Sequence, residues 1–268
     1  MSAANEAADV KLMWINPLGF DAYDAPMADY IKSIKRAGTS VDVVSFRMAA
    51  TPTHLEYRTY EALIVGDTVR AAREAAVQGY DAVVIGCFYD PALEDAREIS
   101  GEAVVVAPCQ ASVQIAANLA NRFSVIVGQH KWIEQMTERV RTYGYSDKLA
   151  SMRSVDIRVN DLQKDCDYTI SRIIEVGKKA IEEDGAEALL LGCTCNFGLF
   201  EDVQRELGVP VIDPICAALK MAEELAHAKK LFGWRPSRAG SCAPPPEDEL
   251  TEFGLFDGPA PIGNRVSV

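Results

Sequence analysis

Two cysteines in matching settings are the residues whose type and spacing indicate chemistry. Cys87 and Cys193 each follow a glycine, and each Gly-Cys pair follows a short apolar run. Two thiols on opposite sides of a planar intermediate can remove a proton from a carbon next to a carbonyl and return one to the other face, one acting as base and the other as acid. Because a cysteine has an ordinary pKa of about 8.5, part of it is already thiolate near neutral pH. These two thiols are therefore the predicted catalytic pair.

An internal repeat places the two cysteines in equivalent positions. When the sequence is shifted on itself by 106 positions, DAVVIGCFYDPAL lies on EALLLGCTCNFGL without a gap. The matched pairs are Gly86 with Gly192, Cys87 with Cys193, Leu93 with Leu199, and Pro108 with Pro214. Apolar positions match by chance, but Gly-Cys followed by the later proline rarely does. We expect two like halves whose Gly-Cys turns converge on one cleft.

Apolar, β-rich runs alternate with helical stretches along the chain. The runs predict buried strands at 10–15, 41–46, 82–85, 104–107, 124–127, 188–191 and 209–212. The helical stretches cover 27–37, 57–78, 111–121, 131–143, 162–183 and 215–230. This alternation predicts an α/β fold with parallel sheets, in which ligands bind outside the carboxyl ends of the strands.

Composition and charge exclude several classes of partner. The 268 residues are enough for two lobes, and the formal net charge of -12 argues against a nucleic acid or an anionic membrane surface as partner. The first ten residues carry no export signal, and no apolar run approaches the ~20 residues that span a bilayer. We therefore expect a cytoplasmic protein with reduced thiols and no membrane segment.

Metal and nucleotide motifs are weak or missing. Cys193-Thr194-Cys195 is a single C-x-C without a second cysteine cluster or a nearby histidine, which is poor evidence for zinc. The sequence holds neither a G-x-G-x-x-G nor a P-loop pattern, so the α/β fold is not interpreted as nucleotide-binding.

The segment 233–268 is a Pro/Gly-rich C-terminal tail with two open interpretations. Its composition favours disorder. However, Leu250, Phe253, Leu255 and Phe256 offer apolar anchors with which it could wrap a neighbouring subunit or lobe.

Three motifs resemble those of a known family. They are Ile15-Asn16-Pro17, GCFYDP at 86–91, and LGCTCNFG at 191–198, the last followed by ELGVPVIDPICAALKMAEEL. Together they resemble the aspartate/glutamate/hydantoin racemase superfamily, and within it the hydantoin racemase branch. The resemblance covers roughly residues 10–232, and Tyr89 departs from it by standing where we expect a glycine.

The resemblance implies a fold, a site and an assembly. It implies two pseudo-symmetric Rossmann-like lobes, 10–107 plus 214–232 and 108–213, with the active-site cleft between them, no PLP or metal cofactor, and a homo-oligomer. It also makes Cys87 and Cys193 the acid/base pair. The substrate's carbonyl or carboxylate oxygens would be held by Asn16 and by the backbone N–H groups of Phe88, Tyr89, Thr194 and Cys195.

The sequence thus predicts a cofactor-independent racemase or epimerase acting on a small hydantoin-like or related carbonyl compound. A decarboxylase or a maleate-type cis-trans isomerase that uses one cysteine is the alternative within the superfamily. A binding protein that captures a small acid without catalysis is the alternative from another class.

Overall fold

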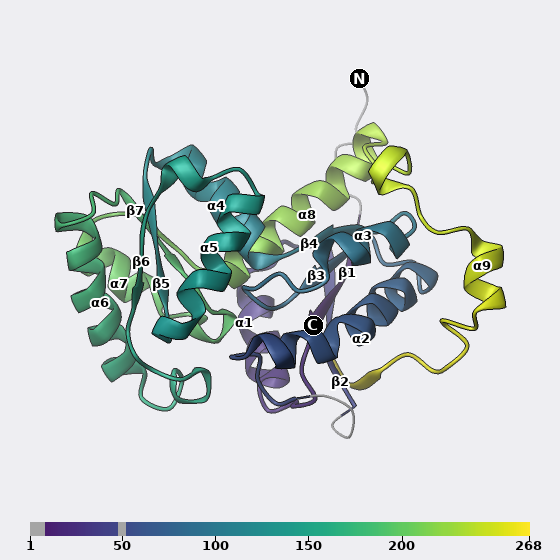
Figure 1. The fold of residues 1–268 in the computed structure, drawn as a ribbon, viewed down its shortest axis with the longest axis horizontal. Coiled ribbons are helices and arrows are strands. Elements are labelled where there is room, and N and C mark those ends of the chain that lie inside the picture. The colour runs from purple at the N-terminus through teal and green to yellow at the C-terminus, as the bar shows by residue number, and fades with distance from the viewer. Residues whose placement is uncertain (1–8, 48–51) are drawn as a thin grey trace. The chain divides into compact units, whose positions relative to one another are not determined.

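The computed structural model describes residues 9–47 and 52–268 and confirms the predicted α/β class, with two largely parallel sheets (Figure 1). The chain divides into two compact units. Unit 1 comprises the described residues up to Ile85, Pro91–Val106 and Leu219–Val268. Unit 2 comprises Gly86–Asp90 and Ala107–Ala218. Each unit is described below by itself.

Unit 1 is built on a five-stranded sheet of order β4-β3-β1-β2-β9. Its strands are β1 (Val10–Asn16), β2 (Thr39–Phe46), β3 (Ala82–Ile85), β4 (Val104–Val106) and β9 (Ile262–Ser267). Its helices are α1 (Asp24–Ile34), α2 (Arg58–Val77), α3 (Leu93–Ile99), α9 (Glu247–Glu252) and most of α8 (Pro214–Phe232). β1 and β3 are almost wholly buried, as expected for parallel strands covered on both faces.

Unit 2 is built on a four-stranded parallel sheet of order β6-β5-β7-β8. Its strands are β5 (Phe123–Val127), β6 (Leu149–Ser154), β7 (Ala188–Leu191) and β8 (Val211–Ile212). Its helices are α4 (Pro108–Leu119), α5 (Ile133–Thr142), α6 (Cys166–Glu182), α7 (Phe200–Leu207) and the start of α8. α7 is capped by Gly208, whose φ of +68° is a left-handed conformation that glycine adopts without strain.

The two sheets share one strand order. Without β9, the sheet of unit 1 runs β4-β3-β1-β2, and the sheet of unit 2 runs β8-β7-β5-β6 in the same sense. β3 and β7, which precede the two Gly-Cys pairs, are therefore equivalent inner strands, and β4 and β8 are equivalent outer strands. The sequence repeat thus corresponds to a repeated sheet topology.

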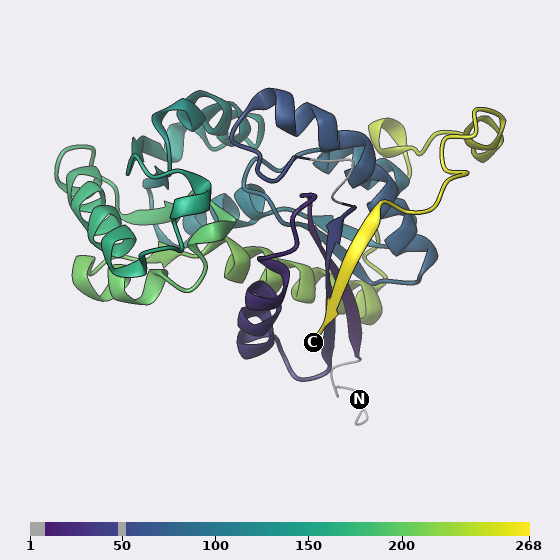
Figure 2. The ribbon, with the colours of Figure 1, turned by 90° about the horizontal axis from the view of Figure 1, so that it is seen from below.

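The C-terminal tail forms structure on unit 1. Its last strand, β9, pairs antiparallel with β2, and Figure 2 shows it in yellow along that strand. Leu250 of α9 is buried, while Arg73 of α2 pairs with Glu247 and lies over the Phe256 ring at 4.7 Å from its centroid. The apolar anchors seen in the sequence thus include one that packs, and the tail wraps the unit to which it belongs.

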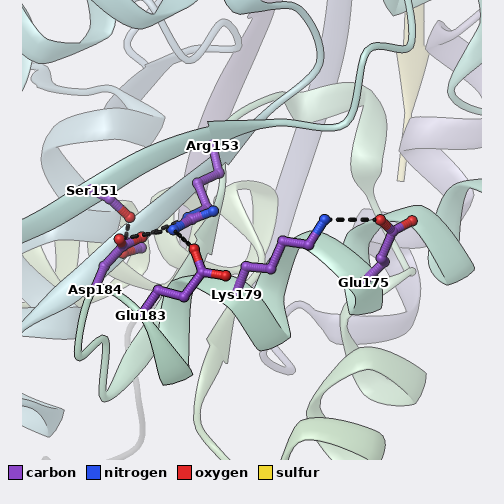
Figure 3. A network of polar contacts seen from close by, with 7 residues as sticks. Ser151, Arg153, Glu175, Lys179, Glu183 and Asp184 are labelled. Carbon is purple, nitrogen blue, oxygen red and sulfur yellow. Dashed lines mark hydrogen bonds and ion pairs between the residues drawn. The ribbon is translucent and has the colours of Figure 1, made fainter.

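The edge strand β6 of unit 2 is held by ion pairs at the end of α6. Arg153 Nε lies 2.6 Å from Asp184 Oδ2, and an Nη of the same guanidinium lies 2.6 Å from Glu183 Oε2 (Figure 3). The Arg153 hydrogen bond lowers the pKa of Asp184 below its ordinary value. All residues of β6 are only half-buried, so this side-chain clamp supplies part of the anchoring that burial supplies in β5 and β7.

Among the described residues, none of the helices combines the length and the apolar character that crossing a bilayer requires.

Candidate active site

The first cysteine lies in a tight turn at the end of β3. The backbone N–H of Asp90 donates to the carbonyl oxygen of Cys87 at 2.9 Å, and Asp90 takes a left-handed φ of 49°. Because C=O and N–H point in opposite directions across a trans peptide, the N–H of Phe88 points away from this turn. The Cys87 thiol is half-buried.

The second cysteine lies in a turn of the same kind after β7. The N–H of Asn196 donates to the carbonyl oxygen of Cys193 at 3.0 Å, so the N–H of Thr194 also points away from its turn. Gln163 holds this loop through its side chain: its Nε2 donates to the carbonyl oxygens of Cys195 at 2.7 Å and Phe197 at 3.2 Å. Asp90 and Asn196 occupy equivalent positions of the repeat, so the two turns match residue for residue.

A hydrogen bond joins the two cysteine loops. The hydroxyl of Thr194, next to Cys193, donates to the carbonyl oxygen of Gly86, next to Cys87, at 3.1 Å. Both loops belong to unit 2, and this bond is buried. The two Gly-Cys motifs, 106 positions apart in the sequence, are therefore neighbours in the fold.

Gly192 allows the chain to pack closely against β5 where the second turn leaves β7. Its N–H donates to the carbonyl oxygen of Ile126 at 2.8 Å. A Cβ on residue 192 would lie 3.0 Å from that same oxygen, 3.0 Å from Val125 Cγ1 and 3.1 Å from Val127 Cγ1. Any larger residue would push against β5 at the position just before the thiol.

A buried carboxylate ties the first cysteine loop to α4. Asp90 Oδ1 accepts from the N–H of Cys109 at 2.9 Å, and Oδ2 accepts from the N–H of Gln110 at 2.8 Å and from the Tyr143 hydroxyl at 2.7 Å. Asp90 is 0% exposed. Burial raises its pKa to about 7, against the opposing effects of the three donors and of the Arg139 charge.

A different carboxylate ties the second cysteine loop to the start of α8. Asp213 Oδ1 accepts from the N–H groups of Ile215 at 2.8 Å and Cys216 at 3.1 Å, which caps α8, and Oδ2 accepts from the N–H of Gly198 at 3.0 Å. Each cysteine loop is therefore fastened to the start of the helix that follows the next strand.

The predicted site residues fall in two places. Phe88, Tyr89, Thr194 and Cys195 flank the two thiols in unit 2, and their side chains are buried. Asn16 ends β1 in unit 1, where its Nδ2 donates to Asp24 Oδ1 at 3.0 Å. The other oxygen of Asp24 accepts from Asn264 of β9 at 2.9 Å, so the tail helps to orient Asn16. Asn16 directly follows Ile15, which pairs with Ile85, the residue before Gly86.

Several residues of this site were not predicted from the sequence. Tyr143 and Gln163 act on the loops across long sequence separations, and no local pattern marks their roles. Asp90 stands in the quoted GCFYDP motif, but its contacts with α4 were not predicted. Asp213 did carry a signal, because an aspartate directly before a proline at a helix start is typical of an N-cap. Asn196 is buried, and its Oδ1 has no hydrogen-bond partner among the described residues.

The remaining cysteines and the acidic groups do not assemble a metal centre in the described part of the chain, where no group of three or more His, Cys, Asp or Glu side chains has the required arrangement. All seven cysteines are thiols, not disulfides. Cys109 is fully buried, and burial together with the Asp90 charge raises the pKa of its thiol well above the ordinary value, so it is a poor source of thiolate.

Comparisons with known proteins point to one family. The family model described as Asp/Glu/Hydantoin racemase matches residues 22–222. A hydantoin racemase of Rhizobium meliloti is 35% identical over 86% of this chain and 93% of its own length, and one of Pseudomonas sp. (strain NS671) is 33% identical over 82% and 88%. The solved structure of an allantoin racemase from Klebsiella pneumoniae superposes with a TM-score of 0.81 at 28% identity, covering 89% of this chain and 94% of that one.

The resemblance drawn from the three sequence motifs is thus confirmed by a family model over most of the chain and by relatives along nearly their whole length. With two matching Gly-Cys turns joined by a hydrogen bond, the chain is an isomerase of the Asp/Glu/hydantoin racemase family.

Proposed function

We propose that this enzyme racemises a hydantoin-like or related carbonyl compound by proton transfer between two cysteines, Cys87 and Cys193. The observation that carries the proposal is the Thr194 to Gly86 hydrogen bond, which brings the two Gly-Cys turns together. The substrate class is supported by the relatives at 33–35% identity, which are hydantoin racemases, and by the structural neighbour at 28% identity, which is an allantoin racemase.

The proposed reaction conserves protons on the enzyme. One cysteine, as thiolate, takes the proton from the carbon next to the carbonyl, and the C–H bonding pair moves into an enolate whose charge lies on the carbonyl oxygen. The other cysteine, as thiol, gives its proton to the opposite face of that carbon and becomes thiolate. The two sulfurs have then exchanged protonation states, which prepares the enzyme for the opposite enantiomer.

The proposal assigns enolate stabilisation to backbone donors of the two cysteine loops. The N–H groups of Phe88 and Thr194 point away from their turns and directly follow the two cysteines in the sequence. Tyr89 and Cys195 supply the next N–H groups along each loop. Donors that are fixed before the reaction stabilise developing charge at little cost in reorganisation.

The experiment is proton NMR in heavy water with the parent, Cys87→Ser and Cys193→Ser. The panel contains both enantiomers of several 5-substituted hydantoins, allantoin, aspartate and maleate. We expect the parent to exchange the α-proton of one substrate class and interconvert its enantiomers. Each single variant should lose interconversion while keeping exchange of only one enantiomer, the one deprotonated by the remaining cysteine.

Two outcomes would count against the proposal. Turnover of maleate to its trans isomer, with a covalent adduct on one cysteine in intact-mass spectra, would instead support an isomerase with a single nucleophile. Binding of a panel acid by the Cys87→Ser, Cys193→Ser double variant at parent affinity, with no reaction in the parent, would instead support a binding protein.

A further inference from the structure

A carboxylate ties each cysteine loop to the start of a helix, but the carboxylate comes from the loop in one half and from the helix start in the other. In the first half the carboxylate belongs to the cysteine loop, as Asp90, and reaches the N–H groups that begin α4. In the second half it belongs to the start of the helix, as Asp213, and reaches back to Gly198. In the sequence repeat, Asp90 aligns with Asn196, and Ala107 aligns with Asp213. Each half therefore has a carboxylate at only one of these two positions.

Because of this difference, the Cys87 loop is coupled to its helix more directly than the Cys193 loop is. One residue, Asp90, both closes the Cys87 turn through its backbone N–H and binds α4 through its side chain. In the second loop these duties are divided, since Asn196 closes the Cys193 turn while Asp213 holds Gly198, five residues after the thiol. A shift of the Asp90 carboxylate must therefore move the turn that presents Cys87.

Resting on the proposed function, we propose that Asp90 is a positioning residue for Cys87, which holds the turn that presents this thiol by tying it to the start of α4 and to Tyr143. Three donors from two helical segments converge on the carboxylate at 2.7 to 2.9 Å. Its side chain is completely buried, so water cannot replace a lost partner without rearrangement. Asp90 acts through the thiol's position and not on the substrate.

Asp90→Asn is the sharpest variant because it keeps the side-chain shape and removes one acceptor. In either orientation its amide NH₂ faces one of the two backbone N–H groups, of Cys109 or Gln110, that the carboxylate now binds. Tyr143→Phe is a milder second variant that removes only the hydroxyl donor. Asp213→Asn is the matched control, because it makes the same chemical change in the carboxylate that ties the second cysteine loop to α8.

Two readouts separate positioning from general destabilisation. The first is the rate at which iodoacetamide alkylates Cys87 and Cys193 in the folded enzyme, followed for each peptide by mass spectrometry. The second is α-deuterium exchange of each enantiomer of a 5-substituted hydantoin. We expect Asp90→Asn to slow the exchange that depends on Cys87 by about tenfold or more, mainly in kcat, because small displacements of a catalytic group have large effects on rate.

The alkylation rate of Cys87 should change severalfold in Asp90→Asn, and that of Cys193 by less than about twofold. Tyr143→Phe should show the same selectivity with smaller changes, and it decides the matter if Asp90→Asn does not fold. Asp213→Asn should show no selectivity for Cys87. Equal changes at both thiols, or no change at either, in folded Asp90→Asn or Tyr143→Phe would overturn the assignment. If no panel compound reacts with the parent, the proposed function fails, while the alkylation rates still test the role of Asp90.

Discussion

Replacing Gly192 by alanine tests whether the packing behind the second thiol sets its position. The added methyl would lie 3.0 Å from the carbonyl oxygen of Ile126, 3.0 Å from Val125 Cγ1 and 3.1 Å from Val127 Cγ1. The carbonyl oxygen cannot easily turn aside, because it accepts the N–H of Gly192 itself at 2.8 Å. The three neighbouring residues are part of the fully buried strand β5.

The expected cost follows from overpacking in a rigid place. One extra methyl in a well-packed core destabilises by about 1–3 kcal/mol, and the upper half of that range applies here because backbone is among the contacts. If the strain is relieved by moving residue 192 a few tenths of an ångström, Cys193 moves with it. A displacement of that size should lower the rate of α-deuterium exchange by roughly tenfold.

The assay pairs urea unfolding with the exchange rate, and Gly66→Ala in α2 is the matched control. A Cβ on residue 66 would meet only the flexible end of Arg70 at 3.5 Å, so this change should be neutral or stabilise α2 by up to ~1 kcal/mol. Unfolding of Gly192→Ala at the parent's urea midpoint, with substrate exchange at the parent's rate, would contradict the predicted overpacking.

The other predictions concern the tail and two carboxylates. Leu250→Ala should remove part of the apolar contact that holds α9, costing about 2–3 kcal/mol locally, and limited proteolysis should then cut the tail earlier than in the parent, whereas unchanged cleavage would argue against docking. Burial raises the pKa of Asp90 from 3.8 to about 7, so the folded protein binds the proton of this carboxyl group more tightly than the unfolded chain does. The free energy of unfolding should therefore fall by at most ~4 kcal/mol as pH rises from 3.8 to about 7. Urea midpoints should show that fall in the parent and lack it in Asp90→Asn, and an identical slope in both would assign it to other groups. The pKa of Asp184 is lowered instead, so its effect on stability has the opposite pH dependence. Its ion pair with Arg153 should stabilise the fold by about 1 kcal/mol above the ordinary pKa of Asp, and this stabilisation should be lost as pH falls through the lowered pKa. Arg153→Gln should therefore remove this sensitivity of stability to acid.

The strands of the core were predictable because each is a short run dominated by apolar residues, many of them β-branched. All seven predicted strands appear in the sheets, at β1 to β5, β7 and β8. The two strands that were missed, β6 and β9, lie at sheet edges and are half-buried or less, so their sequences LASMRS and IGNRVS carry no continuous apolar signal. The short helices α3 and α7 were missed for a related reason, since seven or eight residues give little helical periodicity.

The tail shows why composition alone could not decide between order and disorder. Its proline and glycine residues interrupt regular structure, but Leu250 and Arg265 give it two attachments to unit 1. Arg265 reaches the hydroxyl of Tyr80 at 3.1 Å, a partner 185 positions earlier in the chain. Contacts of that separation are set by topology, which a local pattern does not encode.

At the site, the repeat indicated the thiols but not what holds them. Cys87 and Cys193 stood out because two strand ends carry the same Gly-Cys pair. The bond from Thr194 to Gly86 and the convergence of Tyr143 and α4 on Asp90 depend on how the strands are ordered in space. No local sequence pattern marks these contacts, which form only in the folded chain.

α-Deuterium exchange in heavy water with single cysteine variants tests whether the two thiols act on opposite faces of one carbon. We expect Cys87→Ser and Cys193→Ser each to abolish racemisation of a hydantoin-class substrate, while each retains exchange of a different enantiomer. Retention of full racemisation by either variant, or loss of exchange of the same enantiomer in both, would contradict this expectation.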